Sequence, residues 1–345
     1  MPRVSIIVPN FNHGRFLKRR LGSIFEQTIQ DFELIFLDDA STDNSLEVFK
    51  TFADDSRVTA HVNKSNSGNP FVQWNKGMGL ATGQYIWIAE SDDFAEPTFL
   101  EMMTASLEQH PSAGLATCRS MITDQHDQDL GIFDAYHWFG KRQRWHHDYI
   151  NSGLAEISDF LAFQNTIPNA SATLFKRSLF EHGLRGPENM TVAGDWFFWV
   201  TLLSNADICH VGQPLNHFRQ EHHSSQRARS ATDGSEVLEG IDVYELVVQT
   251  VKMKDRRKLL AQMGLIRRWF SIASRYRIHY QAQRRIYRRF LSVRFASWPV
   301  RTLHFLSVSL AFLLMPLARL PGFRSVAMWF RNLLTGSFRS SGVSR

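Results

Sequence analysis

The chain has 345 residues, of which 43% are hydrophobic and 12% aromatic, and its 39 lysines and arginines outnumber 33 acidic residues. This composition excludes a disordered chain, and the length suits one large domain, or one domain with an appendage. The only cysteines, Cys118 and Cys209, are too far apart to form a zinc-binding pair, and two isolated thiols argue against a disulfide-rich secreted protein. No apolar signal segment precedes the first apolar run, so we expect a cytoplasmic protein.

The charge is distributed unevenly along the chain. Residues 1–250 carry 19 basic and 32 acidic residues, whereas residues 251–345 carry 20 basic residues and one acidic residue, Asp255. The formal balance therefore changes from −13 to +19. We expect the two regions to have different partners.

Short apolar runs alternate with amphipathic stretches over the first hundred residues. Four runs are predicted to be strands, at residues 4–8, 34–37, 57–62 and 84–89. Helices are predicted over residues 16–25, after the helix-start residues 41–44, and from Pro97 onward. This alternation predicts an α/β fold with a Rossmann-like, mostly parallel sheet and helices on both faces.

The rest of the chain has a different pattern. Residues 115–225 are less regular and rich in aromatic side chains, and from about Glu236 the pattern becomes helical. From Lys252 onward, arginines are interleaved with large apolar residues, which predicts a basic helical C-terminal region. Residues 303–317 are mostly apolar, but their length falls short of the roughly 20 residues that a spanning helix needs.

Acidic residues follow two of the predicted strands. Asp38 and Asp39 come after the second strand, and Glu90, Asp92 and Asp93 come after the fourth. Parallel strands would bring both groups to one edge of the sheet, where ligands commonly bind. Acids gathered there repel one another unless a positive charge lies among them, and a divalent cation carrying a diphosphate would suit them. The alternative is that they are helix caps and turn residues.

Four short motifs then resemble the family 2 glycosyltransferases, which have the GT-A fold. They lie in order and in register at residues 8–12 (VPNFN), 37–45 (LDDASTDNS), 66–68 (NSG) and 90–93 (ESDD). The resemblance covers roughly residues 3–105 and extends more weakly to about residue 225. It implies a GT-A catalytic domain over residues 1–230, and the residue pattern predicts an Arg-rich helical tail over residues 231–345.

The resemblance assigns the nucleotide to the first two motifs. Pro9, Asn10, Phe11 and Asn12 would form the loop that holds it, and Phe11 occupies the place of an aromatic residue that stacks on the base. Asp39 would hydrogen-bond the base. Stacking needs a flat apolar face, and recognition of the base needs a fixed acceptor.

The later motifs are expected to serve the ribose, the phosphates and a metal ion. Asp92 would contact the ribose, and Asp93 would bind Mg²⁺ or Mn²⁺ that bridges the diphosphate and neutralises the leaving group. Gly68 and Asn75 are also expected at the donor site. Residues 73–75 replace a segment that carries a phosphate-contacting arginine in many relatives, for which Lys76 is a candidate substitute, and Glu90 stands where the family more often has Asp.

Asp195 is the candidate general base. It matches the family's acid followed by Trp, at the start of a helix on the acceptor side. An inverting transfer needs one carboxylate to take the proton from the acceptor hydroxyl, and a helix N-terminus favours the ionised form. The alternative is a helix-capping Asp beside core aromatics. His222 is a candidate metal or diphosphate ligand, or part of a surface loop.

These observations predict a glycosyltransferase that moves one sugar from a nucleotide-diphospho-sugar to an acceptor hydroxyl. The Q-x-x-R-W pattern of processive synthases is absent, which favours single additions. Two alternatives are a non-catalytic nucleotide-sugar-binding or scaffold member of the fold, and a nucleotidyltransferase. The second would be expected to carry a Gly-rich basic loop near its N-terminus, where this chain has residues 9–12.

The tail is expected to lie on an anionic membrane surface, because arginines alternate there with large apolar residues. The acceptor would then be a saccharide or lipid-linked molecule used in polysaccharide biosynthesis, and the protein would be peripheral or monotopic at the inner membrane face. A nucleic-acid partner is disfavoured, since an apolar stretch such as residues 303–317 has little use in binding RNA. A helical pair packed on the catalytic domain is the third possibility.

Overall fold

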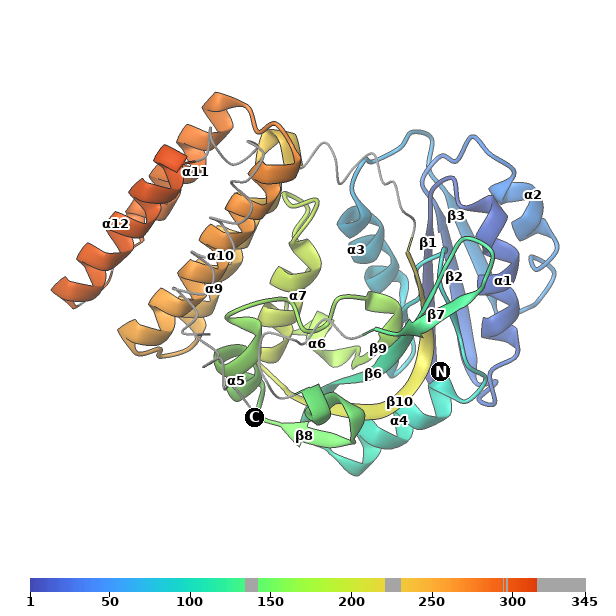
Figure 1. Cartoon of the computed structure of the whole chain (residues 1–345). Coiled ribbons are helices and arrows are strands. Elements are labelled where there is room, and N and C mark those ends of the chain that lie inside the picture. Colours follow the sequence, from blue (N-terminus) through green and yellow to red (C-terminus); the bar gives the residue numbers. More distant parts are fainter. Residues whose placement is uncertain (134–141, 221–230, 294, 296, 315–345) are drawn as a thin grey trace, which may run out of the picture. The chain divides into compact units, whose positions relative to one another are not determined.

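The computed structural model describes residues 1–133, 142–220, 231–293, 295 and 297–314 (Figure 1). The chain forms two compact units. The first contains Met1–Leu161 and Asn165–His222, and the second contains Ala162–Gln164 and His223–Arg345. Each unit has a hydrophobic core of its own.

One mixed sheet organises the first unit. Its first part has the parallel order β3-β2-β1-β4, made of β1 (Val4–Asn10), β2 (Phe32–Asp38), β3 (Val58–Val62) and β4 (Tyr85–Ile88). The sheet continues through β9 (Thr173–Lys176), β6 (Ala113–Thr123), β10 (Asp207–Arg219) and β5 (Phe94–Ala95). β6 and β10 are parallel, whereas β9 is antiparallel to both of its neighbours. Two further strands, β7 (Asp129–Ile132) and β8 (Tyr149–Asn151), pair with β6 and β10. The predicted α/β class is confirmed.

Helices cover both faces of this sheet (Figure 1). α1 (Gly14–Phe25), α2 (Ser45–Lys50) and α4 (Phe99–Gln109) share a core with Val4, Ile6 and Val8, the alternate residues of β1. α3 (Pro70–Leu80) and α7 (Gly194–Leu203) cover the other face, where Phe198 packs against Trp74. Two one-turn helices, α5 (Gly153–Glu156) and α6 (Ser178–Glu181), are shorter.

Helix α3 was not predicted from the sequence. Its residues include Gln73, Asn75 and two glycines, which give little helical periodicity. A start signal is nevertheless present, because the Asn69 side chain accepts a hydrogen bond from the Phe71 amide and Pro70 occupies the first turn. The Asn-Pro pair thus marks a helix that the hydrophobic pattern does not show.

Four helices form the second unit: α9 (Ser235–Thr250), α10 (Asp255–Arg275), α11 (Tyr280–Ser292) and α12 (Trp298–Leu314). They pack in a closed ring, in the order α9, α10, α12, α11 and back to α9. Trp269, Ile286, Phe290 and Val308 are fully buried at its centre. The predicted helical C-terminal region is confirmed. None of the helices in the described part of the chain has the length and apolarity needed to cross a membrane.

The close approach of α3 to β1 yields a stability test. A Cβ atom at Gly77 would lie 2.4 Å from Ile7 Cγ2, so Gly77→Ala forces the helix away from the strand. We expect this substitution to lower the free energy of unfolding by about 1–3 kcal/mol in urea denaturation.

Gly79→Ala, in the same helix, is the matched control. Its added Cβ would meet only Phe180 Cζ at 4.0 Å, and alanine favours a helix over glycine by about 1 kcal/mol. Gly79→Ala should therefore leave stability unchanged or raised. Equal stabilisation by both substitutions would show that the contact between α3 and β1 is not tight.

Candidate active site

The ends of β1 and β2 are tied together at the carboxyl edge of the sheet. Asn10 is paired with Asp38 in the register of the two strands, and its amide donates hydrogen bonds to Asp38 Oδ2 (2.8 Å) and Ser41 Oγ (3.1 Å). Asp38 is completely buried and also accepts from the Ser41 amide. Asp38 therefore acts as a structural acid that fixes the loops after both strands.

These fixed loops leave one aromatic ring open to solvent. Phe11 follows β1 and is 42% exposed. Its neighbour Asn12 has a positive φ of 57°, and its side-chain oxygen accepts from the Thr42 amide at 2.7 Å. Pro9 is buried within β1. The Phe11 ring is thus exposed beside a hydrogen-bonded polar loop, and its stacking on a base stays a prediction.

Asp39 lies in a nearly closed ring of donors. It is 5% exposed and accepts hydrogen bonds from Asn63 Nδ2 (2.7 Å), Gln73 Nε2 (2.9 Å), and the amide and hydroxyl of Ser67 (3.0 and 2.7 Å). Gly68 follows with a φ of +70°, a conformation that favours glycine. Asp39 therefore holds the segment around residues 63–68 against the end of β2.

Four consecutive residues of α3 organise the surrounding acids and loops. Gln73 donates to Asp39, and Trp74 Nε1 donates to Glu90 Oε1 at 2.9 Å. Asn75 bonds to the Gly186 backbone and to Glu188, while Lys76 Nζ donates to Asn63 Oδ1 at 2.7 Å. The segment that departs from the family pattern thus has local structural partners. Lys76 lies in the hydrogen-bond network around Asp39.

Asp93, in the acidic loop after β4, is deeply buried. Asp93 is 2% exposed, and its two oxygens accept from the Arg219 backbone amide (2.9 Å) and Asn169 Nδ2 (2.8 Å). Burial, reinforced by the nearby charge of Asp92, raises the pKa of Asp93 to about 6 and the pKa of Glu90 to about 8. Asp92 is half-buried. The cluster is therefore only partly neutralised by its surroundings.

A buried arginine on α1 supplies part of the neutralising charge, and the sequence analysis missed it. Arg20 has no exposed surface, and its Nε donates to the Glu90 carbonyl at 2.8 Å. Burial lowers the pKa of Arg20 to about 10, opposed by the charges of Asp93, Asp92 and Glu90. Its terminal nitrogens Nη1 and Nη2 have no hydrogen-bond partner. In sequence, Arg20 stands among three other basic residues of the helix, and nothing local distinguishes it.

Arg219, at the end of β10, is a second cation close to these acids. It is 3% exposed, its Nε donates to the Asp92 carbonyl at 2.7 Å, and its guanidinium stacks on Phe16 at 4.3 Å. It also pairs with Asp127. Arg219 thus ties the acidic loop to β10 and to the turn before β7.

A divalent cation can be tested against this donor set. In the described part of the chain, no group of three or more His, Cys, Asp or Glu side chains is placed to hold a metal ion. Mg²⁺ is commonly bound by one or two carboxylates together with substrate phosphates, so three protein ligands are not required. Asp92 and Asp93 are adjacent, and each Asp93 oxygen retains a second lone pair. This pair of carboxylates fits a hard cation. His222, the other predicted ligand, lies outside the described residues.

Asp195 lies in the first turn of α7, as predicted. Its Oδ1 accepts from the Trp196 amide at 2.6 Å, and its Oδ2 accepts from Asn165 Nδ2 at 2.8 Å. The carboxylate is half-buried. Trp196 and Trp199 are buried and belong to the core. The Asp195 carboxylate is thus held by an Asn side chain and by the first turn of α7, and its role as a general base stays a prediction.

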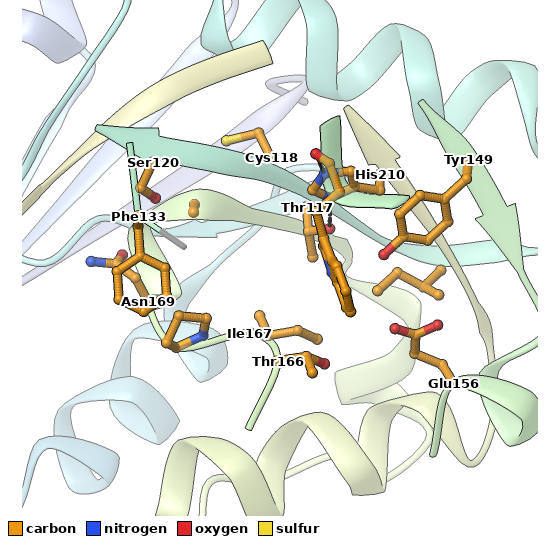
Figure 2. Close-up of a pocket in the computed structure, with 14 residues that line it drawn as sticks. Thr117, Cys118, Ser120, Phe133, Tyr149, Glu156, Thr166, Ile167, Asn169 and His210 are labelled. Atoms are coloured by element: carbon orange, nitrogen blue, oxygen red, sulfur yellow. Dashed lines mark hydrogen bonds between the residues drawn. The ribbon is translucent and has the colours of Figure 1, made fainter. Parts of the chain in front are cut away.

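Figure 2 shows a pocket of the first unit between the sheet and residues 166–169, with Asn169 and His210 among its lining residues. Burial lowers the pKa of His210 to about 4, and its ring bonds to Thr117 Oγ1 and the Trp145 carbonyl. Glu156, also in the lining, forms a two-point ion pair with Arg144. These ionisable groups of the pocket thus have partners within the protein.

Comparison with known families gives the class of the protein. Residues 5–184 match the family described as Glycosyl transferase family 2, which is more than half of the chain. The chain belongs to this family and is a glycosyltransferase. The resemblance identified from the four motifs is confirmed.

Two curated relatives share the N-terminal part. Glycosyltransferase GlyG of Streptococcus pneumoniae is 35% identical over 107 residues, which cover 31% of this chain and 35% of the relative. Poly(ribitol-phosphate) beta-N-acetylglucosaminyltransferase TarP of Staphylococcus aureus is 38% identical over 105 residues, which cover 29% of this chain and 32% of the relative. The matched region thus spans about a third of the length of these relatives.

Solved structures of TarS from S. aureus resemble almost the whole chain. TarS 1-349 of S. aureus in complex with UDP superimposes with a TM-score of 0.64 and 14% identity, covering 99% of this chain and 94% of that one. At this identity the similarity supports the fold. It confirms the GT-A assignment, including the helical C-terminal region.

The burial of Arg20 generates a prediction. Arg20→Met removes a buried positive charge and leaves Glu90, Asp92 and Asp93 without it, so we expect the free energy of unfolding to fall by about 3–5 kcal/mol at neutral pH. The pKa values of both Asp93 and Glu90 are raised, so these two side chains take up protons as the pH falls from 8 towards 5. The loss in free energy of unfolding caused by Arg20→Met should therefore be smaller at pH 5 than at neutral pH.

The same substitution at the adjacent, exposed Arg19 is the control, measured by urea denaturation at both pH values. Its guanidinium stacks on Phe94, a contact worth about 0.5–1 kcal/mol. Similar losses for Arg19→Met and Arg20→Met would show that Arg20 does not neutralise the acidic cluster.

Proposed function

We propose that this glycosyltransferase moves one sugar from a nucleoside-diphosphate-sugar to an acceptor hydroxyl with inversion, and that Asp195 is the general base. The observation that carries the proposal is the separation of two kinds of acid. Asp92 and Asp93 lie at the strand edge beside buried cations, whereas Asp195 lies at the start of α7. Asp92 and Asp93 suit a diphosphate with its cation, and Asp195 suits proton transfer.

The donor nucleotide is assigned to the loops after β1 and β2, which include Pro9, Asn10, Phe11, Asn12, Asp39 and Gly68. Phe11 would stack on the base, and Asp39 would accept a hydrogen bond from it. Four donors already occupy Asp39, about the number that a carboxylate can accept, so the base would displace one of them. The Ser67 hydroxyl is the group most easily rotated away. The complex of TarS with UDP supports a uridine donor.

The phosphate end is assigned to Asp92 and Asp93. Asp92 would contact the ribose, and Asp93 would hold Mg²⁺ or Mn²⁺ with the help of the diphosphate and His222. The cation supplies charge neutralisation for the departing nucleoside diphosphate. Asn75 bonds to residues 186–188, so we propose that it shapes the donor site through that segment.

The acceptor is proposed to be a polyhydroxylated chain or lipid-linked saccharide, as in polysaccharide biosynthesis. The name of TarP, which acts on poly(ribitol-phosphate), supports an acceptor of this chemical class. Asp195 requires only that the acceptor present a hydroxyl, since a carboxylate of this kind accepts one proton as the hydroxyl attacks.

Asp195→Asn tests the base. The amide keeps the size of the side chain, and its single oxygen can still accept from either Asn165 or the Trp196 amide, so the fold and nucleotide affinity should survive. We expect kcat to fall by about 10²- to 10⁴-fold, the usual contribution of general base catalysis. Affinity for UDP with Mn²⁺, measured by calorimetry, should stay within twofold of wild type.

Asp54→Asn, at an exposed site, is the matched control for this experiment. Near-normal turnover of Asp195→Asn would overturn the base assignment. Nucleotide binding by the wild type without transfer to any polyol or saccharide acceptor would instead favour the non-catalytic alternative.

We propose further that the second unit binds an anionic membrane surface, which would make the protein peripheral at the inner face. On α11, Arg284, Arg285 and Arg288 are exposed on the side away from the buried Ile286 and Phe290.

On α12, an apolar face is exposed: Leu303, Leu306, Leu310 and Leu313 are 39–70% exposed and recur at helical spacing. They lie opposite the buried His304, Val308 and Ala311. The two helices are adjacent. The basic face of α11 suits anionic lipid headgroups, and the apolar face of α12 suits the boundary between headgroups and acyl chains.

Binding to vesicles tests this surface. Each arginine near anionic lipid contributes about 1 kcal/mol, so replacing Arg284, Arg285 and Arg288 by Gln should weaken binding to phosphatidylserine-containing vesicles about 100-fold in sedimentation. Vesicles of phosphatidylcholine alone should bind both proteins weakly.

A triple Gln variant of the exposed residues Lys18, Arg19 and Lys50, in the first unit, changes the net charge by the same amount. It should bind like wild type. Equal loss in the two triple variants would mean that binding follows overall charge rather than the surface of α11.

A further inference from the structure

Residues 165–169 (Asn-Thr-Ile-Pro-Asn) connect the two acids that the proposed reaction requires. Asn165, at one end, donates from Nδ2 to Asp195 Oδ2 at 2.8 Å. Asn169, at the other end, donates from Nδ2 to Asp93 Oδ2 at 2.8 Å. Four peptide units span at most about 14 Å, so one short segment sets the positions of both carboxylates.

The two acids are held in the same manner. Each has one oxygen bonded to an Asn of this segment and the other bonded to a backbone amide, that of Trp196 for Asp195 and that of Arg219 for Asp93. A carboxylate bonded at both oxygens cannot rotate freely. Because an ionised carboxylate only accepts, each Asn must present its NH₂ group to it.

The segment itself is fixed at several points. Asn165 Oδ1 accepts from the Ile167 amide at 3.0 Å, which closes a local turn, and Pro168 restricts the backbone after the buried Ile167. Asn169 leads directly to Ser171, whose hydroxyl accepts from the Glu90 amide (3.0 Å) and whose carbonyl accepts from Trp87 Nε1 (2.9 Å). The segment is therefore anchored to β4 and to the acidic loop that follows it.

We propose that residues 165–169 act as a positioning strap, in which Asn165 and Asn169 keep the general base and the diphosphate-side acid at the separation needed for transfer. This inference rests on the roles proposed above for Asp195 and Asp93. A displacement of about 1 Å in a reacting group can cost 10²-fold in rate, so two acids on different elements gain from a common support. Neither Asn is a catalytic residue, since each acts through a carboxylate.

Single and double alanine variants test the strap, with kcat, donor KM and affinity for UDP with Mn²⁺ as readouts. Asn165→Ala should lower kcat about 10- to 100-fold and leave UDP affinity within twofold, because only the base loses its support. Asn169→Ala should lower kcat and also weaken UDP binding. The double variant should lose less activity than the product of the two single losses, because the two residues support one geometry.

Asn151→Ala is the matched control. Asn151 donates to Glu156 Oε2 at 2.7 Å, so it also supports a carboxylate in the first unit, yet it bonds to neither acid of the site. Its kcat should stay within twofold of wild type. If either alanine variant of the strap fails to fold, Asn165→Ser and Asn169→Ser are judged by the same criteria.

Turnover within twofold of wild type for the strap variants, with Asp195→Asn inactive, would overturn the strap and leave the proposed function intact. Strictly multiplicative losses in the double variant would also overturn it, because the two Asn residues would then act separately. Retained turnover in Asp195→Asn would instead contradict the proposed base itself.

Discussion

The accumulation of negative charge at one edge of the sheet is the constraint on which the site depends. Glu90, Asp92 and Asp93 lie within four residues of one another, two of them with raised pKa values caused mainly by burial. Arg20 and Arg219 place positive charge beside them without neutralising them completely. A buried cluster of this kind costs stability in the absence of a ligand. In the proposed function, a cation bound with the donor's diphosphate would offset this cost.

The acids to which the proposed function assigns the chemistry are held by residues from distant parts of the chain. α3 contributes Gln73 to Asp39 and Trp74 to Glu90, while residues 165–169 reach both Asp93 and Asp195. These supporting residues are uncharged amides and an indole, which orient a carboxylate without cancelling its charge. The residues that depart from the family pattern at positions 73–75 therefore serve to orient neighbouring acids and loops.

The parts that could be predicted from sequence are those with local signals. The strands β1 to β4 are continuous apolar runs, and the acids that follow them sit at strand ends in any parallel sheet. Arg20 and Asn169 could not be found in this way, because their importance comes only from contacts across 70 or more residues. The antiparallel placement of β9 between β4 and β6 likewise depends on tertiary contacts and has no local signal in the sequence. α3 lies between these two cases. Its Asn-Pro start is a local signal for a helix, but its residues show little helical periodicity.

The acidic region of residues 1–250 would repel two negatively charged partners, and the basic residues after residue 250 bear on one of them. A region with a balance of −13 repels both a nucleoside diphosphate and an anionic bilayer. For the donor, the repulsion is countered locally, by two buried arginines and by the proposed cation at Asp92 and Asp93. For the bilayer, it would have to be countered by a separate surface, because adding basic residues around the acids would compete with the donor's cation. The concentration of 20 basic residues after residue 250 meets that requirement. In the proposed function, the strongly basic second unit is thus the counterpart of an acidic catalytic unit rather than an independent feature.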